Sequence, residues 1–369
     1  MKIESLSLNN FRNYKNLKTT FSKNLNIIYG ENAQGKTNII EAIFLCASGR
    51  SHRTSKESEL VNVNSSGFYV RLHVIKQEED KTIEISYENG KKKLIKINEI
   101  PVRKIGNLMG NLLAVVFSPE DLLIIKEGPS QRRRFIDITI SQLKPSYFYD
   151  LQIYNKLLLQ RNTLLKEIHK NNNLIDTLEI WDEKIAEVAA KIMIVRHDFI
   201  NKLCDVSEKI HYKLTNDSEK LNILYNPSVR IEKFSDINKL KDMIITEFTK
   251  SRALELRRSI TLIGPHRDDY EMVLNDLSLK MYGSQGQQRT AILSLKFAEI
   301  EIVKDETDDY PVLLLDDVMS ELDTKRREYL FENLSKIQTF ITCTEKDFFD
   351  NKKYGDTIFI NVKSGELNI

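Results

Sequence analysis

Apolar and polar residues alternate in short runs along much of the chain, as they do in β-strands that have one buried face. These runs cover residues 3–8, 17–21, 25–29, 68–75, 81–87, 93–97 and 112–117. Asn89 and Gly90 lie between two of the runs, and Asn-Gly is a frequent hairpin turn. The stretch from 68 to 97 therefore predicts an antiparallel β-meander.

Between residues 119 and 260 the apolar spacing changes to that of helices. Three helices are predicted, over residues 147–169, 178–206 and 237–258. In the second, apolar residues recur every seven positions from Leu178 to Val206, which is a coiled-coil-like stripe. Three asparagines at 171–173 separate it from the first helix, so the two are expected to pack antiparallel. The longest helix would span about 50 to 60 Å.

Beyond residue 260 the pattern returns to alternating strands and helices. Strands are predicted at 259–263, 311–315, 339–345 and 358–360, and a helix follows the polar loop at 283–287. The fold class predicted from this order is α/β, with one head split by an inserted helical domain. The divisions are a head part at 1–118, a helical insertion or arm at 119–260, and a second head part at 261–369.

Composition narrows the class of protein. The 369 residues are 41% hydrophobic, which suffices for a sizeable core. Lys and Arg number 55 against 53 Asp and Glu, a net charge of +2, so a site for a polyanion must be a local patch. Three scattered cysteines favour reduced thiols over disulfides or zinc. We find neither a signal peptide nor a long apolar run, so the protein is expected to be soluble and cytoplasmic, with no membrane partner.

The sequence GENAQGKT at residues 30–37 is the main candidate for chemistry. It follows an apolar strand and opens a helix, which is the context required of the phosphate-binding pattern G-x-x-x-x-G-K-[ST]. Backbone amides of this loop surround a phosphate, Lys36 reaches the β- and γ-phosphates, and the Thr37 hydroxyl binds Mg²⁺. The predicted nucleotide-binding residues are Gly30, Glu31, Asn32, Ala33, Gln34, Gly35, Lys36 and Thr37.

Two later segments contain further candidate residues for the nucleotide site. The apolar strand at 311–315 ends in Asp316 and Asp317, which could hold a metal ion and polarise a water. Asp316 is 280 positions from Lys36 (316 − 36), so the nucleotide-binding head is predicted to be split. The loop at 283–287 precedes a helix, and Ser284 together with the helix amides favours an anion.

Arginines near the phosphate loop have two interpretations. Arg12 lies in a polar turn and could contact the adenine or the phosphates of a nucleotide, or could be a surface arginine. The segment from Gly49 to Thr54 could contact a polyanion, or could end a helix where basic residues are favoured.

The order of GENAQGKT, SQGQQR, LLLDDVMSELD and a final TCT resembles the ABC-type ATPase heads of chromosome-maintenance and DNA-repair proteins. The further segments LNNFRNY, FSPED, GPSQRRRF and GPHRDD resemble the RecF family of bacterial recombination mediators, and the resemblance covers nearly the whole chain. It implies an ABC-type P-loop ATPase head with a mixed sheet and an antiparallel β-meander, split by a short coiled-coil-like insertion.

The resemblance also implies an activity. Such a protein binds ATP and Mg²⁺, forms an ATP-dependent homodimer on single-stranded DNA, gaps or junctions, and helps the RecO and RecR mediators load recombinase, supporting the SOS response. Lys36, Asp317 and Ser284 would be catalytic, and Thr37 with Asp316 would hold the metal. Ser284 and Gln287 belong to the signature loop, which would act on the nucleotide of the partner copy.

Two departures from the general ABC pattern predict slow hydrolysis, suited to a switch. Asp317 stands where Glu is usual, and Gln285 stands where Gly is usual. The alternatives are an ATP-binding subunit of an ABC transporter, and a scaffold that binds ATP without useful turnover. Clustered arginines are the candidates for phosphate contacts to DNA. They are Arg50, Arg53, Arg132, Arg133, Arg134, Arg257, Arg258 and Arg267.

Overall fold

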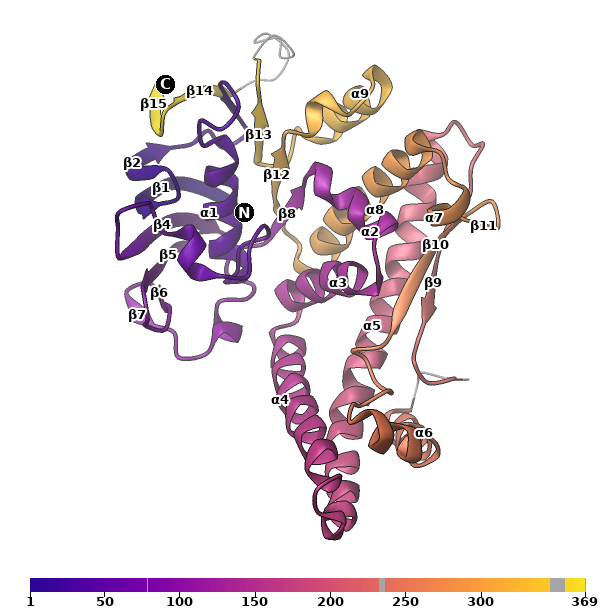
Figure 1. Ribbon diagram of the computed structural model, residues 1–369. Helices are drawn as coiled ribbons and strands as arrows, with labels where there is room; N and C mark the ends of the chain where they lie inside the picture. Colours follow the sequence, from indigo (N-terminus) through magenta and orange to yellow (C-terminus); the bar gives the residue numbers. More distant parts are fainter. Residues whose placement is uncertain (78, 232–235, 346–355, 369) are drawn as a thin grey trace. The chain divides into compact units, whose positions relative to one another are not determined.

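A computed structural model describes residues 1–77, 79–231, 236–345 and 356–368. The chain forms two compact units (Figure 1): a head unit of residues Met1–Leu122 and Ile292–Ile369, and an arm unit of residues Leu123–Ala291. The expected insertion began at 119, close to this division. It was expected to end at 260, whereas the arm unit continues to Ala291, because two strands after 260 join an earlier strand in a small sheet that packs with the arm helices.

The head unit contains an antiparallel sheet formed mostly by the N-terminal residues. Its strands, in spatial order, are β2 (Tyr14–Thr20), β1 (Lys2–Phe11), β4 (Gly67–Lys76), β5 (Glu79–Glu88), β6 (Leu94–Ile97) and β7 (Ile100–Pro101). The pairing of β4, β5 and β6 confirms the predicted meander. Alternate residues such as Leu6, Leu8, Val70 and Leu72 are fully buried, which fixes the register of the sheet.

The second sheet of the head unit brings together strands from both ends of the chain. Its spatial order is β15 (Glu366–Asn368), β14 (Thr357–Lys363), β3 (Leu25–Tyr29), β13 (Thr339–Cys343), β12 (Val312–Asp316) and β8 (Ala114–Phe117). All pairs except β14–β15 are parallel. The carboxyl ends of β3, β13 and β12 therefore meet at one edge of the sheet.

Helix α1 (Lys36–Ser48) contacts strands of both sheets and is buried on nearly all sides (Figure 1). The head unit also holds α9 (Thr324–Asn333), and α8 (Gln285–Thr307) contains the division between the two units. The short 3-10 helices of the chain are η1 (Glu57–Leu60), η2 (Ile105–Asn107), η3 (Pro119–Leu122), η4 (Asn172–Thr177) and η5 (Val318–Ser320).

Helices dominate the arm unit. They are α2 (Leu123–Lys126), α3 (Pro129–Leu143), α4 (Pro145–Ile168), α5 (Leu178–Leu214), α6 (Ile237–Arg258) and α7 (Leu279–Tyr282). Figure 1 shows α4 and α5 side by side and joined at their tip, where Leu164, Leu165, Ile168 and Leu178 form a buried cluster. The three predicted helices are thus confirmed. Within the described residues, no helix combines the length and apolar character that a membrane crossing requires.

The predicted strand at 259–263 is wrong. Its backbone amides bond to side chains instead of to a neighbouring strand: Thr261 N donates to Asn162 Oδ1 at 2.7 Å and Leu262 N donates to Glu255 Oε1 at 2.7 Å. The arm unit instead has a three-stranded sheet in the order β11 (Leu277–Ser278), β10 (Asp269–Leu274) and β9 (Leu221–Asn226), and none of these strands was predicted.

Candidate nucleotide site

The loop between β3 and α1 has a backbone that only glycine adopts readily at two positions. Gly30 has φ +148° and Gly35 has φ +119°. A Cβ on Gly30 would lie 2.4 Å from the carbonyl oxygen of Val362 on β14. Ala33 also has a positive φ, 64°. The loop therefore turns tightly against the end of the parallel sheet, as expected of a phosphate cradle.

Neighbouring segments hold this loop in place. Asn13 Nδ2 donates to the carbonyl of Gln34 at 2.6 Å, and Ser364 N donates to Gln34 Oε1 at 2.6 Å. Glu31, Asn32 and Ala33 are exposed at the rim. Asn13 was not singled out from the sequence, because its contact joins segments about twenty residues apart and carries no local pattern.

Lys36 is folded back onto its own loop. Its Nζ donates to the carbonyl of Gly30 at 2.8 Å and to that of Glu31 at 3.0 Å, and the residue is only 3% exposed. Among the residues that the structure describes, no carboxylate pairs with this ammonium group. A buried cation that bonds only to neutral carbonyls is electrostatically unmatched, and an anionic phosphate would complete its environment.

Asp316 receives two hydroxyl groups at the end of β12. Thr37 Oγ1 donates to Asp316 Oδ1 at 2.8 Å, and Thr342 Oγ1, from β13, donates to the same oxygen at 2.7 Å. Burial raises the pKa of Asp316 above its ordinary value and Asp317 adds to this, whereas the two hydroxyl bonds and the charge of Arg53 oppose it. Hydroxyl and carboxylate oxygens are the ligands that Mg²⁺ prefers, so this set fits that ion.

Asp317 has a left-handed backbone, with φ 52°, and its amide donates to Thr342 Oγ1 at 2.8 Å. Thr342 thus orients both carboxylate residues, since its hydroxyl accepts from one and donates to the other. The structure brings Lys36, Thr37, Asp316 and Asp317 to one end of the parallel sheet. Thr342 was quoted from the sequence only as part of a family motif, without a role.

Arg12 is held by a buried carboxylate of α1. Its Nε and Nη2 donate to the two oxygens of Glu41 at 2.8 and 2.7 Å, and its Nη1 donates to the carbonyl of Glu59 at 2.7 Å. Burial would raise the pKa of Glu41, but hydrogen bonds from Arg12 and Ser51 lower it below its ordinary value. Arg12 therefore has a structural role at the end of β1, and any contact to a nucleotide would have to be made while it stays paired.

The signature loop proves to be the first turn of a helix. α8 begins at Gln285, so only Gly283 and Ser284 of the predicted loop lie outside it. A Cβ on Gly283 would lie 2.6 Å from the carbonyl of Leu279, which explains the glycine between α7 and α8. Ser284 is exposed and Gln287 is half-buried. Both lie in the arm unit, whereas the phosphate loop lies in the head unit.

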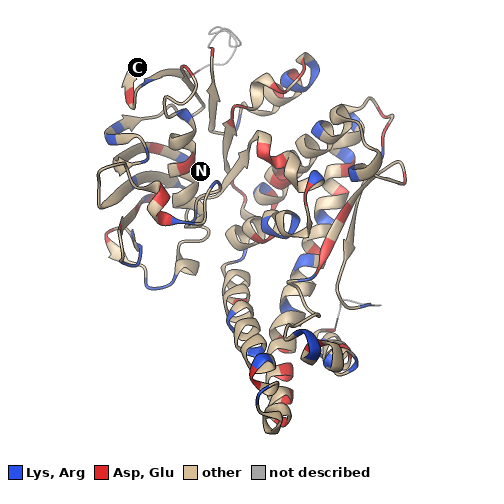
Figure 2. Cartoon of the chain, viewed as in Figure 1, with Lys and Arg blue, Asp and Glu red and all other residues tan. Residues whose placement is uncertain are grey.

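The candidate DNA-contacting arginines differ in how far their side chains are exposed. Arg132 is 7% exposed and makes a bidentate pair with Asp269, at 2.6 and 2.9 Å, so it stabilises the arm unit and is not offered to DNA. Arg133 is half-buried. The exposed members are Arg50, Arg53, Arg134, Arg257, Arg258 and Arg267. Figure 2 shows acidic and basic residues interspersed along the arm helices, in keeping with the small net charge.

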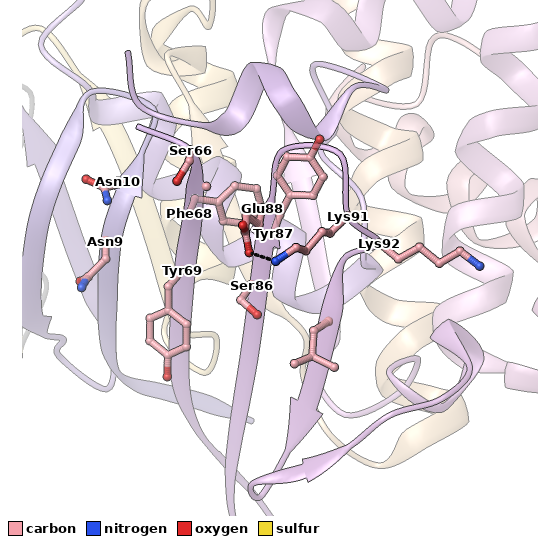
Figure 3. A pocket seen from close by; sticks show the side chains of 12 residues that line it. Asn9, Asn10, Ser66, Phe68, Tyr69, Ser86, Tyr87, Glu88, Lys91 and Lys92 are labelled. Atoms are coloured by element: carbon pink, nitrogen blue, oxygen red, sulfur yellow. Dashed lines mark hydrogen bonds and ion pairs between the residues drawn. The ribbon is translucent and has the colours of Figure 1, made fainter. Parts of the chain in front are cut away.

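A surface pocket of about 520 Å³ lies over β1, β4 and β5 of the head unit (Figure 3). Its walls include Asn9, Tyr69 and Ser86, and Lys91 at its rim pairs with Glu88 at 2.7 Å. None of these residues belongs to the phosphate loop, and none was predicted from the sequence, where the strands carry only the alternation of a half-exposed sheet.

Comparisons with known proteins find similar chains over nearly the whole length. The chain matches the family described as RecF/RecN/SMC N terminal domain over residues 2–364. A protein of Acetivibrio thermocellus named DNA replication and repair protein RecF is 65% identical over 365 residues, 99% of each chain. A protein of the same name from Ruminiclostridium cellulolyticum is 52% identical over 369 residues, 100% of this chain and 99% of that one.

Solved structures are similar over the same length. A structure of the recombination mediator protein RecF with ATP, in the RecFOR pathway, has a TM-score of 0.94 and 42% identity, covering 100% of this chain and 97% of the other. An SMC head domain from Pyrococcus furiosus has a TM-score of 0.55 at 16% identity, covering 100% and 95%, which shows a shared fold. The ABC-type ATPase head predicted from the sequence is thereby confirmed.

Proposed function

Since the chain belongs to the RecF/RecN/SMC family, and within it to the RecF proteins of DNA replication and repair, we propose that it is an ATP-driven switch that pairs with a second copy on DNA. Membership of this family implies binding and hydrolysis of ATP. Family membership also favours this assignment over the alternative, an ATP-binding subunit of a transporter. Beyond family membership, we propose which residues act on ATP, that two copies of the chain pair, and which DNA structures they bind.

The observation that carries the proposal is that two buried groups at one sheet edge, Lys36 and Asp316, make no ion pair in the described part of the chain. Lys36 bonds only to carbonyls, and Asp316 bonds only to hydroxyls, in the described part of the chain. A bound Mg²⁺–ATP would supply both missing charges: phosphate oxygens for Lys36, and the cation for Asp316 and Thr37. The Mg²⁺ ion would neutralise charge on the phosphates.

The residues of the chain have distinct roles in this proposal. Gly30 to Thr37 hold the phosphates, and Asp317 orients and polarises the attacking water. Aspartate reaches less far than glutamate, so turnover is slow and ATP acts mainly as a switch. A signature loop on a second copy, with Ser284 and Gln287, would close on the γ-phosphate, because a helix N-terminus favours an anion.

We also propose partners by family analogy. The relatives are named for replication and repair, and one is described within the RecFOR pathway. This supports a dimer that binds single-stranded DNA, gaps or junctions, works with RecO and RecR in the cytoplasm, and contributes to the SOS response. The exposed arginines Arg257, Arg258 and Arg267 are candidates for contacts that track the backbone without reading sequence.

Light scattering tests the central claim. The mass of the purified chain should rise from monomer to dimer on addition of Mg²⁺–ATP, and gapped DNA should favour the dimer further. Lys36→Ala should stay monomeric, because the phosphates lose their cation. Lys15→Ala removes an exposed lysine of the same unit and should pair normally. An unchanged mass of the wild-type chain at saturating ATP would overturn the switch. Phosphate release with and without gapped DNA then separates a slow switch from a scaffold.

A further inference from the structure

The first turn of α8 is closed by its own side chains. Gln287 N donates to Ser284 Oγ at 3.2 Å, and Ser284 N donates to Gln287 Oε1 at 2.9 Å. This reciprocal pair, in the sequence Ser-x-x-Gln, is a capping box. It satisfies backbone donors that would otherwise point outward from the helix end. The amide of Ser284 is therefore occupied in this state, although a phosphate at this turn would require it.

A carboxylate from another part of the arm unit holds the capping glutamine. Gln287 Nε2 donates to Glu219 Oε1 at 2.8 Å. The other oxygen, Glu219 Oε2, lies 3.2 Å from Nε2 of His211, which is fully buried near the end of α5. A carboxylate that bonds at both oxygens has little freedom to move, so Gln287 is fixed through its amide nitrogen.

The turn that carries Glu219 is itself fixed. Asn216 and Asp217 have positive φ values of 52° and 60° and reverse the chain after α5. At its far end, Lys220 N donates to Asn275 Oδ1 at 2.8 Å, and Asn275 N donates to the carbonyl of Lys220 at 3.0 Å. Glu219 is thus held between the last turn of the longest arm helix and the β10–β11 hairpin.

We propose that Glu219 is a positioning residue that holds the signature turn closed and sets the threshold for pairing of two copies on ATP. This inference rests on the proposed function, because it concerns regulation of the same turn. To bind a γ-phosphate, Ser284 N must exchange Gln287 Oε1 for a phosphate oxygen, and Glu219 resists this by retaining the glutamine. Its negative charge close to the turn also opposes the approach of an anion.

Hydrogen exchange in the nucleotide-free monomer tests the restraint directly. The amides of Ser284 and Gln287 form the two bonds of the capping box, so their exchange reports its opening. Glu219→Ala should accelerate exchange of a peptide covering 283–288 about 10-fold, the effect of losing one charge-assisted bond. Glu219→Gln keeps an acceptor without the charge and should give a smaller increase. Glu208→Gln removes a charge that pairs with Lys220 and should change nothing.

Pairing measurements test the consequence. The dissociation constant of the ATP-bound dimer should fall about 3- to 10-fold in Glu219→Ala and less in Glu219→Gln, while the affinity of the monomer for ATP stays unchanged. A merely structural role would weaken both. Unchanged exchange, or pairing weaker than wild type in a folded variant, would overturn the restraint. Faster exchange in a chain whose wild type never pairs would instead uphold the restraint and reject the proposed switch.

Discussion

The two units bury charge in opposite ways. In the arm unit, the guanidinium of Arg161 on α4 is fully buried, with Asp182 of α5 at 2.8 Å and Glu255 of α6 at 2.6 Å. Its remaining contacts are the Thr261 hydroxyl, at 2.8 Å, and the ring of Phe248. In the head unit, Lys36 and Asp316 are almost as deeply buried, but within the described residues neither makes an ion pair: Lys36 bonds to carbonyls and Asp316 to hydroxyls, and Arg53 acts on Asp316 only through its charge.

This difference distinguishes buried charges that stabilise the fold from buried charges that are suited to binding a ligand. Buried ion pairs with matched charges and further hydrogen bonds are complete. Arg252 of α6 also donates to Asp182, at 2.9 Å, so the arm cluster (Arg161, Arg252, Asp182, Glu255 and Thr261) has two cations and two anions, joins three helices and needs no ligand. A buried charge that meets only dipoles costs free energy until an ion arrives. The cradle cluster (Lys36, Thr37, Asp316 and Thr342) is of that second kind. Within this cluster burial raises the pKa of Asp316, and a perturbed carboxyl group of this kind is typical of functional sites.

Breaking the arm cluster should give the largest effect on stability. Arg161→Ala leaves Glu255 buried without its cation and leaves Asp182 with Arg252 alone, which is expected to lower the free energy of unfolding of the arm unit by about 3 to 5 kcal/mol. Urea unfolding, followed by the single tryptophan, Trp181, which packs against a buried cluster in the arm unit, measures this.

The matched control for this change is Arg257→Ala on α6, where an exposed arginine is removed and the unfolding free energy should change by less than about 0.5 kcal/mol. The triple change Arg161→Met, Asp182→Asn and Glu255→Gln removes the three most deeply buried charges together, leaves only the partly exposed Arg252, and should recover part of the loss. If Arg161→Ala alone unfolded at the wild-type urea concentration, the cluster would not be what holds α4, α5 and α6 together.

Removing the lysine of the cradle cluster should reduce the affinity for ATP strongly and change the stability of the fold little. Lys36→Met keeps an unbranched side chain and removes the unmatched cation. ATP affinity should fall about 100-fold, the equivalent of one or two charged hydrogen bonds to phosphate, or about 3 kcal/mol. Stability without nucleotide should be unchanged or slightly raised. Calorimetric titration with Mg²⁺–ATP and urea unfolding of the same samples measure the two quantities. A loss of stability as large as that of Arg161→Ala would place Lys36 among the structural charges.

The cradle could be predicted from sequence because its pattern is local. Residues 25–37 contain the strand, the glycines, the lysine and the helix within one short segment, and the structure shows each where the pattern indicates. Asp316 could be associated with the loop only through the order of motifs along the chain. Thr342 joins Asp316 to Asp317, yet a threonine at the end of a strand carries no distinguishing pattern.

The arm unit shows where sequence patterns fail. Its long helices have clear apolar periods; the first and third were predicted within two residues, whereas α5 continues eight residues beyond the predicted end at 206. The strand expected at 259–263 was wrong because its amides bond to Asn162 and Glu255, contacts that depend on how three helices pack. β9 and β10 were missed since they pair with each other across more than forty residues. Arg132 looked like a DNA contact because its partner, Asp269, lies 137 positions away.

The smallest expected effect on stability comes from a histidine that is buried in its neutral form. His266 lies in the arm unit. Its Nδ1 is 2.6 Å from the hydroxyl oxygen of Tyr154, and its Nε2 is 3.1 Å from the carbonyl oxygen of Thr261. Burial lowers the pKa of His266 to about 4, and the charges of Arg267, Arg133 and Arg161 act in the same direction, against the bond to Thr261. The group is thus kept neutral, in contrast to both clusters.

The sign of the pH effect follows from this. The folded pKa lies below the unfolded value of about 6.5, so the unfolded chain takes up a proton that the folded chain refuses. Stability from this group is complete above pH 6.5 and is lost as the pH falls towards 4, by on the order of 2 kcal/mol. His266→Gln retains a donor for Thr261 but does not titrate. Urea unfolding of both proteins between pH 7.5 and 4.5 should show a shallower decline for the variant. Parallel declines would mean that the histidine is protonated in the folded arm, and that Tyr154 and Thr261 stabilise its charged form.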